Sequence, residues 1–337
     1  MNRRLNVSAS PHVRSSVTTA GIMRDVALAL TPAALFGVYM FGFRAFLVLI
    51  VSMTSCVLFE YLYLRLLKKK TECFDYSALV TGLLLGMNLS VNVPLWVPIL
   101  GSAFAIIVVK QLFGGLGQNF MNPALAARCF LLISVGNLMT DFEVVSKENA
   151  GFWNVVYRGA AATKGYCSGV DGVSYATPLA QIKDGAEVSF AKVFFGFTGG
   201  TIGETSAFLL LLGGIYLLAK KVISLRIPVA YLLSFVVFMA LMSGHGLDFE
   251  YLLLEVCSGG LILGALFMAT DYVTSPITPA GKIVFGIFLG FLTTVYRVYG
   301  NSCEGVSFAI ITGNILVPLI EKVTMPRSFG KGGKANG

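Results

Sequence analysis

The chain has 337 residues, of which 56% are hydrophobic and only 12% are charged, and its mean hydropathy is +0.79. Soluble domains carry about 25% charged residues, so the composition excludes an ordinary soluble domain and predicts a polytopic membrane protein. The formal net charge is +8, but the basic residues fall in short loops, as membrane topology requires. We therefore expect no nucleic-acid partner.

Hydropathy predicts an all-α protein with about ten membrane-spanning helices in two groups of five. The first half, 25–139, follows a basic N-terminal segment, 1–24, and contains spans at 25–42, 44–66, 77–93, 95–113 and 123–139. A polar loop, 140–203, leads to the second half, 204–322, and a basic tail, 323–337. The second half contains spans at 204–220, 227–243, 251–269, 282–298 and 306–322.

The positive charges favour one orientation in the membrane. Placing both termini in the cytoplasm puts the clusters Lys68–Lys70 and Lys220–Lys221 on the cytoplasmic side, as the positive-inside rule requires. Of seven cations on the other side, five lie in the loop 140–203, and the rule is weak for long loops. The sequence thus predicts a multi-pass protein of the cytoplasmic (inner) membrane with an external long loop. The apolar run from Val26 leads directly into a second one, so no cleavable signal peptide is expected.

Glycine-rich turns occur in both halves, at Gly114–Asn119 and at Gly199–Glu204. Their related positions suggest an internal repeat, which five spans per half would make inverted in the membrane. Close helix packing is the simpler explanation of these glycines. Alternatively, backbone N–H groups face an anion or a polar ring. Glu204 and Thr205 would then line a polar pocket near the outer face.

Several polar residues lie within or beside the predicted spans. Asn122 precedes a proline that begins the fifth span, an ordinary helix start. Arg128 lies inside that span at a high cost, so it either snorkels to the inner surface or serves a bound ligand. Asp271, Thr274 and Ser275 follow the eighth span, where they form either a simple exit turn or a site facing a cofactor or an ion path. Asp25 and Asp75 lie near inner span ends and are open to the same two interpretations. Glu60 is a weaker pathway candidate, and Thr81 and Asn88 are candidates for ion contact only as intramembrane polar residues.

The cysteines and histidines do not indicate a metal. The chain has six cysteines and two histidines, with no CxxC pair, so local zinc or iron–sulfur ligation is not expected. Cys56, Cys129 and Cys257 lie in apolar runs and are interpreted as packing residues.

The run from Asp171 to Thr177 lies in the polar loop and is followed by Pro178. It is either an ordinary turn or an attachment signal of the form Asp-x-x-Ser/Thr-Gly-Ala-Thr. At such a signal a flavin transferase joins FMN to the last threonine through a phosphoester bond. Asp171, Ser174 and Thr177 match the signal, whereas Tyr175 stands where glycine is usual.

Further segments occur in the order and at the spacing of one known family. They are Ser10–His12, Asp75–Gly82, Gly114–Asn119 with Asn122–Ala124, Ser174–Leu179, Gly203–Ser206, Ala269–Asp271 with Thr274–Pro276, and Glu304–Ala309. On these motifs nearly the whole chain resembles the NqrB/RnfD family of membrane flavoprotein subunits. The lack of a long N-terminal extension favours the RnfD branch of that family.

This resemblance implies an electron-transfer subunit of an Rnf-type translocase, without an NAD site of its own. Such a subunit carries electrons across the membrane between ferredoxin and NAD-linked subunits, coupled to Na+ or H+ movement. Its cofactors would be covalent FMN on Thr177 and a non-covalent riboflavin. Its partners would be a second flavoprotein subunit, membrane iron–sulfur subunits, cytoplasmic ferredoxin- or NADH-reactive subunits, membrane lipid and the flavin transferase. The fold would resemble the inverted repeats of urea and ammonium transporters.

The resemblance also suggests surroundings for each flavin. Lys183, Lys192 and Arg297 are outer cations able to balance the FMN phosphate, and Arg297 is preferred because it lies at an outer helix end against the charge bias. Glu204 and Thr205 complete the expected FMN surroundings. Asn122, Arg128, Asp271, Thr274 and Ser275 are the candidates for a second flavin or an ion path. The alternative functions are a transporter or channel of the same fold without covalent flavin, and a scaffold subunit without a cofactor.

Overall fold

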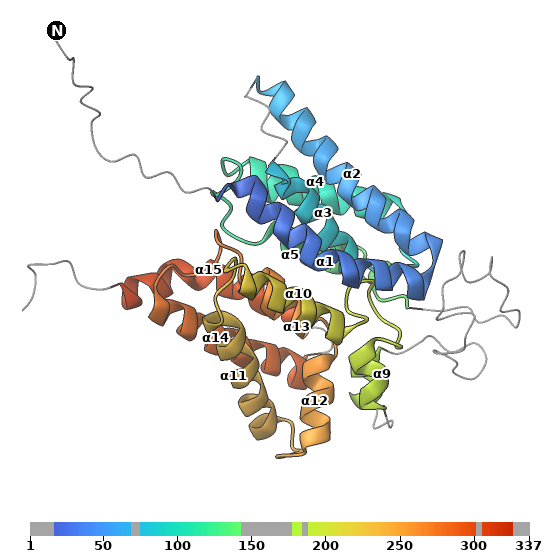
Figure 1. The fold of residues 1–337 in the computed structure, drawn as a ribbon, viewed down its shortest axis with the longest axis vertical. Helices are drawn as coiled ribbons and strands as arrows, with labels where there is room; N and C mark the ends of the chain where they lie inside the picture. The colour runs from blue at the N-terminus through green and yellow to red at the C-terminus, as the bar shows by residue number, and fades with distance from the viewer. Residues whose placement is uncertain (1–16, 69–74, 143–176, 184–187, 301–304, 326–337) are drawn as a thin grey trace, which may run out of the picture.

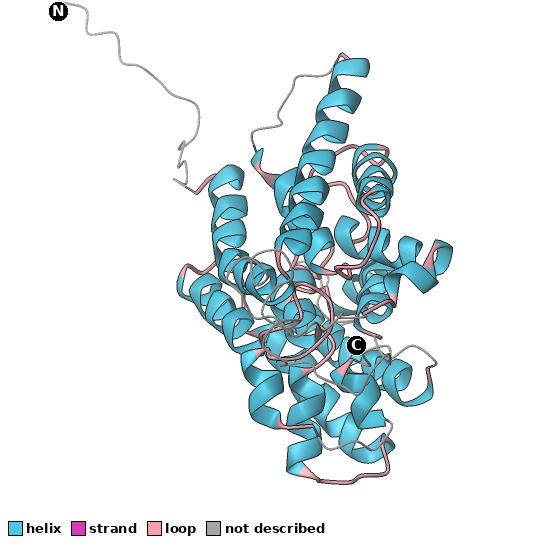
Figure 2. Cartoon of the chain, turned by 90° about the vertical axis from the view of Figure 1, so that its right-hand side faces the viewer, coloured by secondary structure: helices cyan, strands magenta, loops and turns pink. Residues whose placement is uncertain are grey.

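The computed structural model describes residues 17–68, 75–142, 177–183, 188–300 and 305–325. Within these ranges the regular secondary structure is helical and contains no strand (Figure 2). The attachment-signal residues Asp171 and Ser174 lie outside the described residues, whereas Thr177 lies within them.

The first half begins with two long helices, α1 (Thr19–Phe41) and α2 (Phe43–Leu66). Gly42, with φ of +80°, provides the tight link between them. The shorter elements follow: α3 (Ser77–Met87), α4 (Trp96–Ala103) continuing into the π-helix η2 (Phe104–Gln111), α5 (Pro123–Ser134) and α6 (Gly136–Met139). The Asn122 side chain accepts hydrogen bonds from Ala124 N and Leu125 N and so caps α5.

The loop between the halves contains the short helices α8 (Pro178–Lys183) and α9 (Phe190–Phe195). The second half contains α10 (Ala207–Ala219), α11 (Arg226–Met242), α12 (Phe249–Cys257), α13 (Leu261–Leu263) with the π-helix η3 (Gly264–Met268), α14 (Pro279–Tyr299) and α15 (Val306–Thr324). The side chains of Ser206 and Thr278 cap α10 and α14.

The prediction of an all-α polytopic membrane protein is confirmed for the described residues. Each predicted span overlaps an apolar helix or a pair of helices. Four of these helices, α1, α2, α14 and α15, are long and apolar enough to cross a membrane alone, and α12 with α13–η3 forms a pair bent by 63°. The remaining five apolar segments have 10–17 residues each, which is short for a complete span. The inverted-repeat relation between the halves stays a prediction.

Several helix boundaries differ from those expected, and one span is broken. The third span ends at Met87 instead of 93, and the sixth begins at Ala207 instead of 204, so Glu204 and Thr205 precede α10. The eighth span, expected to be continuous, is interrupted at Ser258–Gly260. These differences leave irregular backbone within the protein, and its N–H and C=O groups must form hydrogen bonds with neighbouring segments.

The two halves meet along α1 and α10, which lie side by side (Figure 1). Gly213 of α10 allows this approach, because a Cβ there would lie 2.3 Å from the carbonyl oxygen of Ala29. Beside this contact, Ile202 N donates to Leu89 O at 3.1 Å and Gly203 N donates to Met87 O at 2.7 Å. The irregular backbone after α3 and before α10 is thus paired across the junction between the halves.

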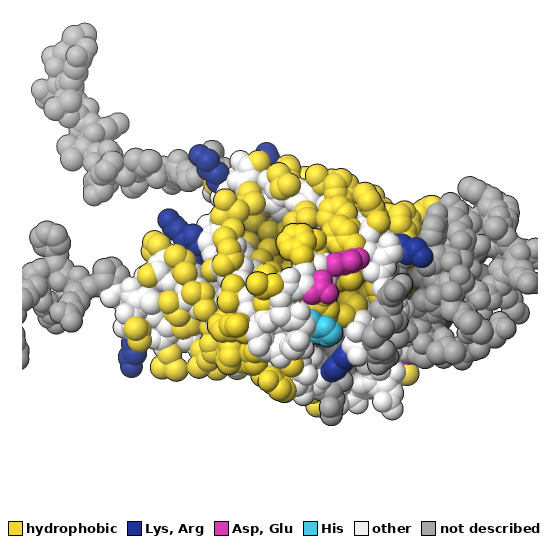
Figure 3. Space-filling model, turned by 90° about the horizontal axis from the view of Figure 1, so that it is seen from below, with side chains coloured by type: hydrophobic (Ala, Val, Ile, Leu, Met, Phe, Trp, Pro, Cys, Tyr) yellow, Lys and Arg dark blue, Asp and Glu magenta, His cyan; other side chains and the backbone are white. Residues whose placement is uncertain are grey.

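Large apolar side chains cover much of the outer surface. Seen from below, the molecule presents a largely hydrophobic face with a small zone of acidic, basic and histidine side chains (Figure 3). A surface of this kind is suited to contact with lipid.

Candidate functional site

Thr177 lies immediately before α8 and lines a cavity of about 280 Å³. Its carbonyl oxygen accepts from Gln181 N at 3.0 Å, and its hydroxyl accepts from Ala180 N at 3.4 Å. The other residues that line this Thr177 cavity are Pro178, Val193, Thr198, Gly199, Gly200, Glu204, Cys257, Ser258 and Gly259. The structure therefore brings the predicted residues Thr177 and Glu204 to one cavity. Thr205 is buried beside it, with 2% exposure, but does not line it.

One wall of the Thr177 cavity is the break in the eighth span. Gly259 and Gly260 have φ values of +64° and +68°, a conformation that other residues adopt at a cost. A Cβ on Gly260 would lie 2.5 Å from Glu204 Oε1. The Ser-Gly-Gly sequence was the available signal for this break, and the hydropathy of the surrounding run obscured it.

Arg297 of α14 binds this break from the other side. Its guanidinium donates to Glu255 O at 2.6 Å, Glu255 Oε2 at 2.8 Å and Ser258 O at 2.9 Å. These contacts satisfy carbonyl groups at the end of α12 that the interruption leaves without helical partners. Arg297 is only 5% exposed, so it is a buried residue of the helix break and not a surface cation. Its expected role at the FMN phosphate stays a prediction.

The two other expected cations differ in their surroundings. Lys183 Nζ donates to Gly300 O at 3.0 Å, and Lys192 is exposed on α9. Lys183 and Arg297 also line a second cavity, of about 580 Å³, together with His245, Tyr251 and Glu255. Neither lysine lines the Thr177 cavity.

Arg128 forms a buried ion pair. One guanidinium nitrogen lies 3.2 Å from Glu204 Oε1, and the other donates to Asn88 Oδ1 at 2.6 Å. Arg128 is 4% exposed, so the snorkelling alternative is wrong and the side chain points to a partner in the second half. Because a charge within a membrane protein is costly unless paired, Glu204 explains why Arg128 is tolerated.

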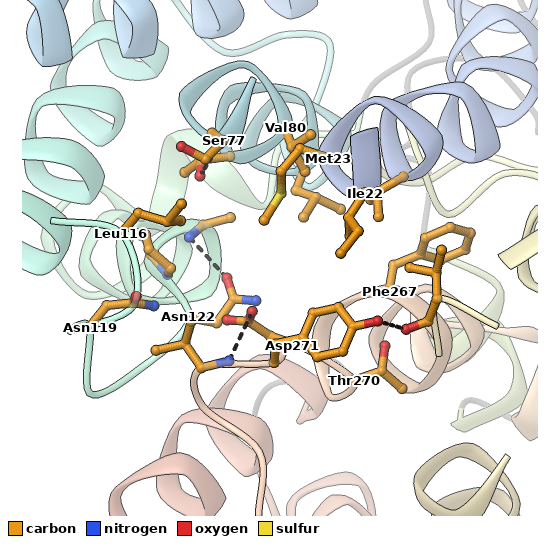
Figure 4. A pocket seen from close by; sticks show the side chains of 18 of the residues that line it. Ile22, Met23, Ser77, Val80, Leu116, Asn119, Asn122, Phe267, Thr270 and Asp271 are labelled. Atoms are coloured by element: carbon orange, nitrogen blue, oxygen red, sulfur yellow. Dashed lines mark hydrogen bonds between the residues drawn. The ribbon is translucent and has the colours of Figure 1, made fainter. Parts of the chain in front are cut away.

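A further cavity, with an empty volume of about 790 Å³, lies between the halves, and we call it the Asp271 cavity. Figure 4 shows Asn119, Asn122 and Asp271 along one side of it and Met23 and Val80 along another. Its remaining lining residues include Ile22, Ser77, Thr81, Leu84, Lys110, Leu116, Leu217, Phe267 and Thr270. Mostly apolar walls with a few converging polar groups are typical of a small-molecule site.

Asp271 follows the bent helix pair and lies outside it. Its carboxylate accepts from Thr274 Oγ1 at 3.2 Å and from Val273 N at 3.5 Å. Burial raises the pKa of the Asp271 carboxyl above its ordinary value, although these hydrogen bonds act in the opposite direction. Thr274 and Ser275 are buried and do not line the cavity, so of these three predicted residues only Asp271 faces it.

A further buried ion pair, which the sequence did not predict as a pair, adjoins the Asp271 cavity. Lys110 Nζ lies 2.6 Å from Glu60 Oε1 and 2.6 Å from Ser77 Oγ, and Gln111 Nε2 donates to Glu60 at 2.7 Å. Both charged side chains are at most 5% exposed. The available signal was the presence of one carboxylate and one ammonium near the ends of apolar spans, where each needs a partner.

The described residues contain no group of three or more His, Cys, Asp or Glu side chains placed to hold a metal ion. Cys56 and Cys129 are buried, in keeping with a packing role, and Cys257 borders the Thr177 cavity.

Comparison with known proteins gives matches along almost the whole chain. Residues 6–330 match the model of the NQR2, RnfD, RnfE family. The chain is 43% identical over 331 residues to the D subunit of the Na+-translocating ferredoxin:NAD+ oxidoreductase complex of Acetobacterium woodii, covering 97% of this chain and 95% of that protein. It is 38% identical over 336 residues to the D subunit of the proton-translocating ferredoxin:NAD+ oxidoreductase complex of Clostridium ljungdahlii, covering 96% of each chain. It is 40% identical over 345 residues to the D subunit of the ion-translocating oxidoreductase complex of Stutzerimonas stutzeri, covering 95% of this chain and 94% of that protein.

Proposed function

The chain belongs to the NQR2, RnfD, RnfE family, and from this we propose that it is the D subunit of an Rnf-type translocase. In this role it carries electrons across the membrane between ferredoxin and NAD-linked subunits while Na+ or H+ is moved. The support is the similarity over nearly the full length of relatives named as the D subunits of such complexes. Its partners are the other Rnf subunits, including a second flavoprotein subunit, membrane iron–sulfur subunits and cytoplasmic subunits that react with ferredoxin or NADH.

We further propose that FMN is joined to Thr177 through a phosphoester bond. The observation that carries this proposal is the position of Thr177, half-buried at the wall of a cavity that also contains Glu204. Gly199, Gly200 and Gly259 contribute backbone without side chains to this cavity, which leaves polar N–H and C=O groups available to a flavin. The flavin would supply the redox chemistry, and the protein would position it and set its electrostatic surroundings.

We assign the non-covalent riboflavin to the Asp271 cavity. Its walls are mostly apolar with a few converging polar groups, as is usual for small-molecule sites. Asn119, Asn122 and Asp271 offer amide and carboxyl groups for the polar edge of the ring, while Met23 and Phe267 offer apolar contacts for its faces. These residues bind and orient the ring and exclude water from it.

The covalent link is tested on a denaturing gel. The protein produced together with its flavin transferase should show flavin fluorescence, and Thr177→Ala should show none. Thr198→Ala is a matched control, because Thr198 lines the same cavity and should leave the fluorescence unchanged. A wild-type band without fluorescence would exclude covalent FMN. That result would instead favour a transporter or channel of this fold, or a scaffold subunit.

The second flavin is tested by releasing and identifying non-covalent flavin from purified protein. Wild type and Thr177→Ala should both release riboflavin. Asn122→Leu is expected to release less, because the substitution places an apolar side chain at the polar side of the cavity. Equal riboflavin release by Asn122→Leu and wild type would place that flavin elsewhere.

A further inference from the structure

A buried series of polar contacts runs from the Thr177 cavity to the Asp271 cavity. Glu204, which lines the first cavity, pairs with Arg128 at 3.2 Å, and Arg128 donates to Asn88 at 2.6 Å. Asn88 Nδ2 lies 3.9 Å from the sulfur of Met268, whose carbonyl oxygen accepts from Asn122 Nδ2 at 3.4 Å. Asn122 lines the second cavity. The two cavities are therefore the two ends of one cluster.

Arg128 carries the permanent positive charge of this cluster. Its guanidinium is withdrawn from solvent together with Asn88 and Met268, and all three residues are at most 4% exposed. Buried charges act over longer distances than exposed ones, because little water screens them. The charge of Arg128 must therefore influence both cavities.

The backbone around Arg128 fixes these distances. Gly203, which precedes Glu204, donates from its N–H to Met87 O at 2.7 Å, next to Asn88. Gly260 lies against the Glu204 carboxylate so closely that a Cβ would approach it to 2.5 Å. The carboxylate is thus held between the guanidinium and the break of the eighth span, and it has little freedom to leave.

We propose that the Arg128–Glu204 pair is an electrostatic bridge that sets the midpoint potentials in both cavities together. The inference rests on the proposed function, since it requires a flavin at each end. Reduction adds negative charge to a flavin, and a nearby positive charge favours the reduced form. Glu204 opposes this effect at the Thr177 cavity, which it borders directly, more strongly than at the Asp271 cavity. Both residues act through charge and position and are not themselves oxidised or reduced.

The decisive variant is Glu204→Gln, which removes the negative charge that faces the Arg128 guanidinium. Redox titration of the purified complex should show a raised midpoint potential for the covalent flavin and a smaller rise for the non-covalent one. Adding Arg128→Gln to this variant should return both potentials to near the wild-type values, because the pair is then neutral again. Adding Arg128→Lys should instead preserve the rise. Lys192→Gln is the control for the loss of an exposed charge and should shift neither potential.

Asn88→Asp provides an independent variant that keeps the ion pair. It adds a negative charge beside the guanidinium, so both potentials should fall. If Glu204→Gln does not fold, Asn88→Asp alone still tests the proposal. Unchanged potentials in folded Glu204→Gln or Asn88→Asp protein would show that the pair only stabilises the junction between the halves.

The gel assay separates the two ideas. Absent fluorescence in the wild type contradicts the covalent cofactor, and with it the premise of the bridge. If every variant shows flavin fluorescence but its midpoint potentials are unchanged, only the bridge is contradicted, and the covalent cofactor stands.

Discussion

Single buried charges determine much of the chemistry of this protein. Arg128, Glu60 and Arg297 each stand out in the sequence, because a charge in or beside an apolar span needs a partner. Their partners were not predictable, since Arg128 and Glu204 are 76 residues apart and belong to different halves. Hydropathy identifies which residue requires compensation, but only the packing of distant helices determines what provides it.

The Lys110–Glu60 pair gives a prediction at this scale. Lys110→Met should destabilise the protein by about 3–5 kcal/mol, because it leaves the Glu60 carboxylate buried without its counter-charge. Thermal unfolding in detergent, followed by circular dichroism, should show a clearly lower midpoint. Lys110→Met combined with Glu60→Leu should recover most of the loss. Lys220→Met, which removes an exposed ammonium, should have little effect, and an equal loss in that control would contradict the account.

At the scale of elements, the existence of the helices was predictable and their ends were not. The third span ends at Met87 and the sixth begins at Ala207, so the residues expected to extend them, 88–93 and 204–206, lie outside the helices. The reason is that these flanking segments satisfy each other's backbone, through the bonds from Ile202 and Gly203. A hydropathy window treats each segment alone and cannot register such pairing.

The break of the eighth span gives a second prediction. Gly260→Ala should destabilise the protein for two reasons: the positive φ of +68° and the approach of the new Cβ to Glu204 at 2.5 Å. Gly244→Ala isolates the first effect, because Gly244 has φ of +79° and open space around it. The strain alone is worth about 1–2 kcal/mol. Thermal unfolding should therefore place Gly260→Ala below Gly244→Ala, and the reverse order would show that Glu204 moves aside freely.

Arg297 gives a third prediction for the same break. Arg297→Lys keeps the charge but loses the planar group that reaches Glu255 and Ser258 together. It should raise hydrogen–deuterium exchange at residues 255–260 relative to wild type, with normal flavin fluorescence on a gel. Arg226→Lys, at the exposed start of α11, should leave exchange in that segment unchanged. Loss of fluorescence in Arg297→Lys with unchanged exchange would instead favour a direct role at the FMN phosphate.

At the scale of the whole molecule, two contacts between helix ends agree with the predicted topology. The hydroxyl of Tyr216 donates to Asp25 at 3.3 Å, and Arg44 donates to Val91 O at 2.9 Å. Each bond joins two helix ends that the positive-inside rule assigns to the same side. The order of the apolar helices could therefore be predicted from hydropathy, whereas the two cavities depend on how the halves pack.

Cysteine labelling tests this topology. In a background with the six native cysteines replaced by alanine, His245→Cys should react with a membrane-impermeant maleimide added to intact spheroplasts. Lys220→Cys should react only after the membrane is permeabilised, because the predicted ten-span topology places it on the cytoplasmic side. Labelling of Lys220→Cys in intact spheroplasts would reverse the orientation.

The paired backbone at the junction of the halves has a consequence for how the protein works. Carriers with inverted repeats move a substrate by rocking one bundle against the other around a fixed site. Here the bonds from Ile202 and Gly203 to Leu89 and Met87, together with the Arg128–Glu204 pair, tie the bundles at the place where such a hinge would have to open. The interface is therefore suited to holding the two proposed flavins at a constant separation. A fixed separation benefits electron tunnelling, whose rate falls steeply with distance, and it hinders alternating access.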